Sequence, residues 1–261
     1  MGIQLPEMSM AQFEIVSNFM SFGIACMMAG ALFFFFGKSL VAPKYRLSML
    51  LTAIVPAIAF YHYVRIYDSW HGAFTLTGGS YVPSGVPFND AYRYVDWILT
   101  VPLLTTELVL ALGLAKAITK KLSIRLASAA AIMIALGYPG EVSSNSGVRW
   151  LFWSLSMIPF LYILYVLFTE FTNHIKDQPP KVQPIISGAR AILLVTWCFY
   201  PIAFLLPMVG LSGAAGEVGL QVGYTIADVA AKVGFGVMIF AICKAKTAEE
   251  GWEPQELAGV K

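Results

Sequence analysis

The stretch YTIADVAAKVGFG, residues 224–236, places an aspartate and a lysine inside a run of small and apolar residues. Asp228 and Lys232 are four residues apart, so on a helix both side chains lie on one face, one turn from each other. If this run crosses a membrane, each charge has a high cost in free energy and calls for a specific role. The fold therefore depends on whether the rest of the chain is also built for a membrane.

The composition is that of a membrane protein. Of the 261 residues 58% are hydrophobic and 12% are charged, about half the charged share of soluble domains, and the mean hydropathy is +0.71. Apolar runs of about 20 residues recur, each long enough to cross a hydrocarbon core. We predict an all-α membrane protein, a single domain over residues 1–261 with seven transmembrane helices, at residues 14–36, 46–67, 90–115, 122–142, 148–171, 189–209 and 218–243.

The connections indicate the topology. Residues 69–87, between the second and third spans, alternate around two glycines and predict a short β-hairpin. Lysine and arginine gather in the first, third and fifth connections and after the last span, so we expect these in the cytoplasm and the N-terminus outside. The net charge of +2 then reflects topology and not nucleic-acid binding. The membrane is either the plasma membrane or an endomembrane, and the polar N-terminus argues against a cleaved signal peptide.

Charged residues follow one face of the third span. Asp96 and Glu107 are eleven residues apart, about three helical turns or roughly 16 Å, and Thr100 lies between them. Carboxylates at two depths can form a proton relay, although charges that simply pair between helices are the alternative. Glu107 has no lysine or arginine within a turn and is expected to be protonated at rest, whereas Asp96 is expected to be ionised by the nearby Arg93.

The sixth span carries an aromatic stripe. Its members, Trp197, Tyr200, Pro201 and Phe204, are three or four residues apart, around a proline that is expected to kink the helix. Ordinary packing explains most such stripes, and a wall for a flat apolar ligand is the alternative. In the second span, His62 is either a satisfied core histidine or the partner of a titrating carboxylate.

Three motifs together resemble the microbial (type 1) rhodopsins: DVAAKVGFG in the seventh span, RYVDWILTVPLL in the third and WCFYP in the sixth. The resemblance covers all seven spans and is greatest to the proteorhodopsin and xanthorhodopsin group of light-driven outward proton pumps. It implies that Lys232 binds all-trans retinal as a protonated Schiff base. It further implies counter-ions at Asp96 and Asp228, with Asp96 as the proton acceptor hydrogen-bonded by His62, a proton donor at Glu107, and relay or gate positions at Thr100 and Arg93.

The same resemblance implies the chromophore pocket and the partners. Leucine at position 104 implies green absorption, and Trp153 stands where carotenoid-binding members carry glycine, so no carotenoid antenna is expected. The partners are membrane lipid and protons, family members commonly form trimers or pentamers, and no metal site is expected. The predicted retinal-pocket positions are Tyr63, Trp97, Leu104, Met133, Gly137, Trp153, Ser156, Trp197, Tyr200, Pro201 and Phe204.

Two other functions remain open at this point. A photosensor or light-gated channel would use the same scaffold, although Glu107 and the short tail argue against a sensor. A seven-helix transporter or receptor without a chromophore would make Asp228 and Lys232 a plain ion pair. In all three the chain is a transporter or receptor and not an enzyme.

Overall fold

The computed structural model describes residues 5–211 and 213–253, and within them seven helical segments are long and apolar enough to span a membrane. The chain is an integral, multi-pass membrane protein of all-α class. The segments are built from the helices α1 (Met10–Gly37), α2 (Arg46–Ala73), α3 (Ala91–Ala111), α4 (Lys116–Glu141), α5 (Ser146–Phe168) with α6 (Glu170–Lys176), α7 (Gln183–Leu205), and α8 (Ala214–Val229) with α9 (Phe235–Glu249).

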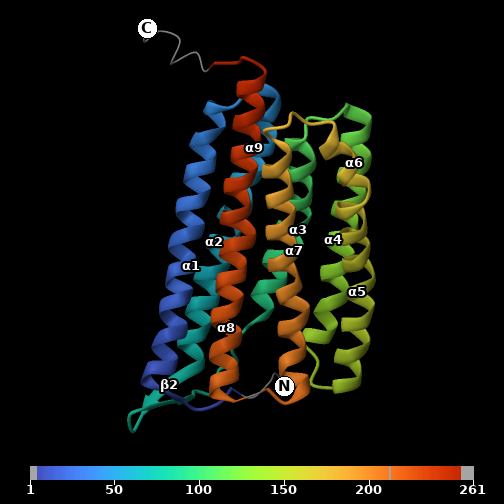
Figure 1. The fold of residues 1–261 in the computed structure, drawn as a ribbon. Coiled ribbons are helices and arrows are strands. Elements are labelled where there is room, and N and C mark those ends of the chain that lie inside the picture. The colour runs from blue at the N-terminus through green and yellow to red at the C-terminus, as the bar shows by residue number, and fades with distance from the viewer. Residues whose placement is uncertain (1–4, 212, 254–261) are drawn as a thin grey trace.

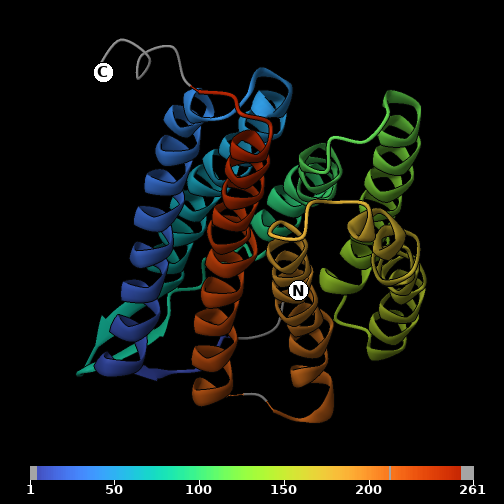
Figure 2. The same cartoon turned by 45° about the horizontal axis from the view of Figure 1, so that its top comes forward.

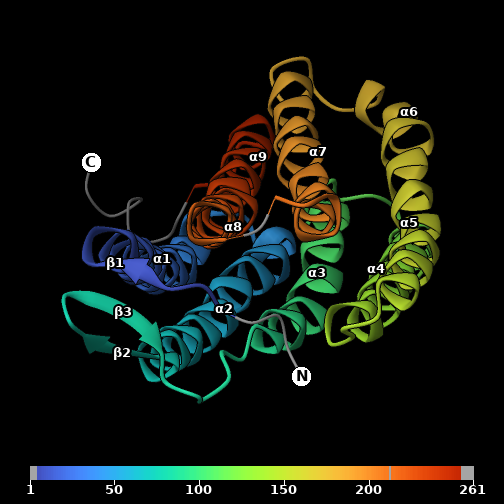
Figure 3. The same cartoon turned by 90° about the horizontal axis from the view of Figure 1, so that it is seen from below.

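The helices form a closed bundle in chain order (Figure 1). Each helix packs against the next from α1 to α5, α7 packs against α9, and α8 packs back against α1. Seen from below, α7 and α3 lie between the α8–α9 segment and the pair of helices α4 and α5 (Figure 3). Large apolar side chains on the outside remain exposed, for example Phe36 at 69% and Val195 at 72%, as expected for surfaces that meet lipid.

A small antiparallel sheet covers one end of the bundle. Strands β2 (Phe74–Thr77) and β3 (Ser80–Pro83) form the predicted hairpin, which turns at Gly78 and Gly79. Both glycines have positive φ, 60° and 91°, as a tight two-residue hairpin turn requires. A third strand, β1 (Met8–Ser9), pairs with β3 from the chain start, which the sequence did not predict. The sheet lies at the end opposite to the last turns of α9 (Figure 2).

Several helix boundaries differ from the predicted spans. The third helix ends at Ala111 and not at residue 115, because Gly113 takes a left-handed φ of 61° that stops it. The fifth span continues past a break at Thr169 into the short helix α6. The seventh changes to a π-helix, η4 (Ala230–Gly234), between α8 and α9, which has consequences for Lys232.

Candidate functional site

Lys232 lies in the middle of the bundle, on the π-helical turn η4. A π-helical turn breaks the regular α-helical hydrogen-bond pattern and is frequent at functional sites. The side chain is 2% exposed, and its Nζ donates to Asp228 Oδ1 at 2.5 Å and lies 3.0 Å from Asp96 Oδ2. One buried ammonium is therefore held between two buried carboxylates, one from α8 and one from α3.

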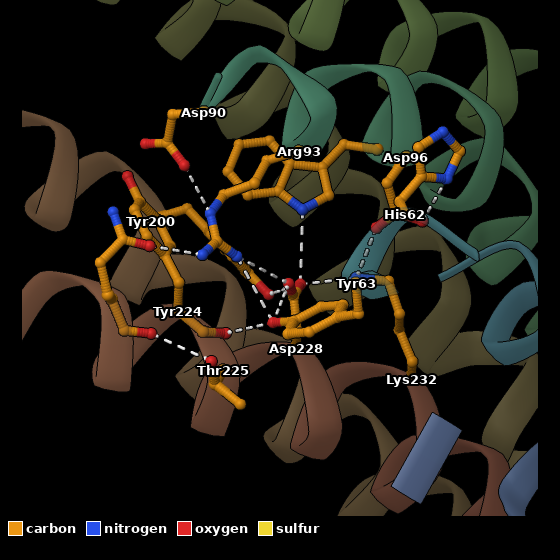
Figure 4. Close-up of polar contacts among 12 residues, drawn as sticks. His62, Tyr63, Asp90, Arg93, Asp96, Tyr200, Tyr224, Thr225, Asp228 and Lys232 are labelled. Carbon is orange, nitrogen blue, oxygen red and sulfur yellow. Dashed lines mark hydrogen bonds and ion pairs between the residues drawn. The ribbon is translucent and has the colours of Figure 1, made fainter. Parts of the chain in front are cut away.

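Asp228 is surrounded by donors besides Lys232 (Figure 4). The hydroxyl of Tyr63 donates to Oδ2 at 2.8 Å, and the hydroxyl of Tyr200 donates to Oδ1 at 2.7 Å. The indole of Trp97 donates to Oδ1 at 3.3 Å, and Arg93 Nη1 lies 3.8 Å from Oδ2. Hydrogen bonds and positive charges of this kind stabilise the ionised form of a carboxyl group.

Asp96 has far fewer partners. Its Oδ2 faces Lys232, whereas its Oδ1 is buried and has no hydrogen-bond partner among the described residues. His62 Nδ1 lies 3.9 Å from this Oδ1 and is hydrogen-bonded to the carbonyl of Ile58, one turn back on its own helix, at 3.0 Å. The expected hydrogen bond from His62 to Asp96 is therefore not formed in the structure, and the two side chains are neighbours within ion-pair range.

Arg93 connects the carboxylates to the sheet end of the bundle. Its Nε donates to Asp90 at 2.8 Å and its Nη2 to Gln221 at 2.6 Å, while Gln221 in turn donates to Glu217 at 2.9 Å. The sequence placed Arg93 beside Asp96, but its ion pairs are with Asp90 and Asp228. The guanidinium contacts these groups although Asp96 is only three residues away on the same helix.

Glu107 lies on the side of Lys232 away from Arg93, toward the C-terminal end of α3. It is completely buried, and neither carboxyl oxygen has a hydrogen-bond partner among the described residues. The hydroxyl of Ser48 donates to the backbone carbonyl oxygen of Glu107 at 2.9 Å. Thr100, between the two acids, donates to the backbone carbonyl of Asp96 at 2.9 Å. The structure thus places buried carboxyl groups at two depths along one helix, as the spacing predicted.

Lys232 lines a cavity within the helix bundle. Its empty volume is about 810 Å³, which includes the part that is open to the surface. Lys232 is the only charged side chain among the described residues that line it, and the remaining lining is largely aromatic and aliphatic. The lining suits an apolar molecule with one end that can react with the lysine amine.

The comparison with protein families agrees with this geometry. A family model described as a bacteriorhodopsin-like protein matches residues 14–245. The chain belongs to this family. It is 32% identical to the bacteriorhodopsin of Halobacterium salinarum, over 84% of this chain and 80% of that protein. It is 29% identical to a green-light absorbing proteorhodopsin of Gamma-proteobacterium EBAC31A08, over 84% of this chain and 82% of that protein.

Solved structures of other microbial rhodopsins have the same fold. Xanthorhodopsin, described as a light-driven ion pump with dual chromophore, is 51% identical, with a TM-score of 0.92, over 96% of this chain and 100% of that chain. A thermophilic rhodopsin is 48% identical, with a TM-score of 0.93, over 95% of this chain and 100% of that chain. The predicted membership of the microbial rhodopsins is therefore confirmed.

Most of the pocket residues predicted for this rhodopsin line the cavity. They are Trp97, Leu104, Met133, Gly137, Trp153, Ser156, Trp197, Tyr200, Pro201 and Phe204. Tyr63 does not line it and instead donates to Asp228, on the other side of the lysine. The sequence prediction missed Tyr94, Val101, Ile134, Met157, Phe160, Tyr224 and Ala231.

Helical spacing could have found several of the missed lining residues. Val101 follows Trp97 by four positions, Phe160 follows Ser156 by four, and each pair shares a helix face. Of the partners that Arg93 reaches, Gln221 gave no such signal because it comes from another helix, whereas Asp90 lies only three residues before Arg93 at the start of the same helix.

Proposed function

We propose that the protein is a light-driven outward proton pump that binds all-trans retinal covalently, as a protonated Schiff base at Lys232. The observation that carries the proposal is the surroundings of the lysine. A buried amine between two carboxylates opens into an aromatic cavity, and a third buried carboxyl group lies farther along the same helix. Relatives that include a light-driven ion pump support ion transport, and these acids favour the proton as the ion.

The residues present fit the chromophore. Lys232 Nζ, an amine in the structure, stands in for the Schiff-base nitrogen, and the aromatic lining of the cavity suits a flat conjugated chain. When bound, retinal supplies a light-driven change of shape that alters the proton affinity of the nitrogen to which it is attached. Trp97, Trp197 and Tyr200 line the cavity and would pack against the bound retinal, which would limit the shapes that it can take.

The unequal hydrogen bonding of the two counter-ions supports separate roles. Asp228 accepts hydrogen bonds from Tyr63, Tyr200 and Trp97, and these bonds keep its carboxylate ionised throughout the light-driven transport cycle. Asp96 has a free Oδ1 among the described residues, and its Oδ2 is 3.0 Å from Lys232 Nζ. The proton of the Lys232 nitrogen therefore passes to Asp96 and not to Asp228.

Glu107 supports the direction of transport. A buried carboxyl group without a partner is most stable with its proton bound, so it can return a proton to Lys232 after Asp96 has taken one. Lysine and arginine at the α9 end of the bundle indicate that this end faces the cytoplasm. Protons then enter on the Glu107 side and leave on the Arg93 side.

Illumination of cells that express the chain tests the proposal. In an unbuffered suspension supplied with retinal, we expect a visible absorption band and acidification of the medium under light, which a protonophore abolishes. A light-gated channel would instead let protons flow down their gradient, and a sensor would give no steady pH change. Either result, or the lack of a visible band, would overturn the proposal.

A further inference from the structure

The last turn of α9 contains a buried lysine that has no part in the mechanism above. Lys246 is 6% exposed. Its Nζ donates to the backbone carbonyl of Leu112 and, at 2.6 Å, to Oε1 of Gln178, and it lies 5.3 Å from the centre of the Tyr45 ring. Among the described residues no carboxylate lies within 4.0 Å of it. A buried ammonium held by neutral acceptors has a high desolvation cost, which calls for a role.

The acidic groups closest in this region already have other partners. Glu250 accepts from Lys44 at 2.7 Å and from the hydroxyl of Tyr45 at 2.5 Å, and Glu249 pairs with Lys181 at 3.4 Å. The ammonium of Lys246 therefore interacts with its two neutral acceptors, the carbonyl of Leu112 and the side chain of Gln178, and not with these acids. Its partners, and not a neutralising acid, explain its place.

These two acceptors belong to parts of the chain that are far apart in sequence. Leu112 follows the last residue of α3, where the backbone carbonyls form the negative end of the helix dipole. Gln178 lies in the connection between α6 and α7. The ammonium also lies directly over Gly113, where an added Cβ would come within 3.3 Å of Nζ. Lys246 thus ties α9, α3 and the α6–α7 connection together at one end of the bundle.

This tie lies between solvent and Glu107. On its outer side is a polar cavity, which Lys246 lines together with Lys44, Gln178, Glu249 and Glu250. On its inner side, Glu107 precedes Leu112 by five residues, about 7.5 Å along the axis of α3. Buried apolar side chains of Leu108 and Ile242 belong to the core on this inner side.

We propose that Lys246 is a positioning residue for proton uptake: it holds this end of α3 closed and keeps a positive charge between outside water and Glu107. The proposal rests on the proposed pump function. Reprotonation of Glu107 then requires the bonds from Lys246 to Leu112 and Gln178 to open. The positive charge also lowers the local concentration of protons between outside water and Glu107, so proton uptake is slow while the lysine is in place.

The expected effect is an acceleration of proton uptake when the charge and the bonds are removed. A unit charge roughly 10 Å away, at an effective dielectric constant of about 20, changes a proton equilibrium by about tenfold. Salt and water in the outer cavity screen part of this. We expect uptake in Lys246→Met to be about three- to tenfold faster than in the native protein, because Met has similar length but no charge.

The experiment measures proton uptake after a flash, with a pH-indicating dye, in the retinal-bound full chain. Lys246→Arg keeps the charge and donors and should retain slow uptake. Gln178→Leu removes one acceptor and should accelerate uptake less than Lys246→Met. Lys244→Met is the matched control, since Lys244 is exposed, lies on the same helix and gives the same change of net charge. Its uptake should stay within about twofold of native, because exposed charges are screened.

A second readout needs neither light nor retinal. Cys243 is fully buried one turn from Lys246, on the inner side of the tie. With Cys26 and Cys198 changed to serine it is the only thiol left in the chain. We expect a water-soluble maleimide to label Cys243 in the dark several-fold faster in Lys246→Met than in the native background or in Lys244→Met.

The outcomes separate the two proposals. If the native protein takes up no protons after a flash, the pump function and the role of Lys246 both fail. If it does, and Lys246→Met leaves uptake and labelling unchanged, slows uptake, or acts no differently from Lys244→Met, only the role of Lys246 is wrong. Failure of Lys246→Met to form a pigment leaves Gln178→Leu to decide: faster uptake supports the role and native uptake overturns it.

Discussion

Replacing Lys232 by alanine tests the centre of the site by two independent measurements. The substitution removes the only lysine among the described residues that line the cavity, so the protein should remain colourless after retinal is added. It also breaks the contacts of 2.5 Å to Asp228 and 3.0 Å to Asp96. Removing one member of a buried ion pair costs about 3–5 kcal/mol, because the charge that remains is uncompensated. We expect a loss of this size in the stability of the retinal-free protein.

The two carboxylates should contribute unequally to that loss. Asp228 keeps its bonds from Tyr63, Tyr200 and Trp97, whereas Asp96 is left without a close donor among the described residues. Neutralising Asp96 in the same chain, as Lys232→Ala/Asp96→Asn, should therefore restore about 2 kcal/mol or more of the lost stability. Lys232→Ala/Asp228→Asn should restore less, because it deprives Arg93 of a charged partner.

The assay is unfolding of the retinal-free proteins in detergent, with native retinal-free protein as the reference, so that ligand stabilisation does not enter the comparison. The visible spectrum after addition of retinal is recorded on the same samples. A stable visible pigment in Lys232→Ala would place the attachment elsewhere. Equal recovery by Asp96→Asn and Asp228→Asn would refute the argument that hydrogen bonding distinguishes the two acids.

Four further predictions concern colour, proton transfer and the antenna. In Asp96→Asn the negative charge 3.0 Å from the lysine nitrogen is lost, so absorption should be red-shifted at every pH and pumping absent; a native-like spectrum contradicts this. In His62→Ala the pH midpoint of the colour change that accompanies protonation of Asp96 should move, since the ring lies 3.9 Å from Asp96. An unmoved midpoint would show that His62 does not influence Asp96. In Glu107→Gln, proton uptake after a flash should slow by about 100-fold, the usual effect of losing a proton-transfer group, and native rates would exclude Glu107 as donor. Added hydroxylated carotenoid should contribute nothing to the action spectrum of pumping by the native protein, because Trp153 fills the space that a carotenoid ring would need. Trp153→Gly should open this space, at a packing cost of about 3–5 kcal/mol. A carotenoid band in the action spectrum of the native protein would show that the space is already open.

The fold was predictable because hydropathy acts over long segments. Each span needs about 20 apolar residues, and this requirement is readable without knowledge of neighbouring helices. The hairpin was readable from Gly78 and Gly79, whose positive φ few other residues tolerate. The two-residue strand Met8–Ser9 was not, since it exists only through its pairing with Tyr81 and Ser80.

The site was predictable where its members share a helix. Asp96, Thr100 and Glu107 follow one face of α3, and spacing alone groups them. The partners of single side chains were less predictable: Arg93 bonds Asp90 and, on another helix, Gln221 instead of Asp96. His62 bonds the backbone of Ile58 on its own helix. A long or rotatable side chain has several partners within reach, and the choice between them depends on packing that one sequence does not specify.

The difference between Asp96 and Asp228 links these points to function. Both are aspartates, both are buried, and both contact the same nitrogen at 3.0 and 2.5 Å. If both acids accepted the same hydrogen bonds, the proton of the lysine nitrogen could pass to either of them, and the route of transfer would not be defined. Here Tyr63 and Tyr200 donate to one acid, and neither donates to the other. In the proposed mechanism, hydrogen bonds from neighbouring helices, and not the identity of the acids, therefore decide which carboxylate takes the proton.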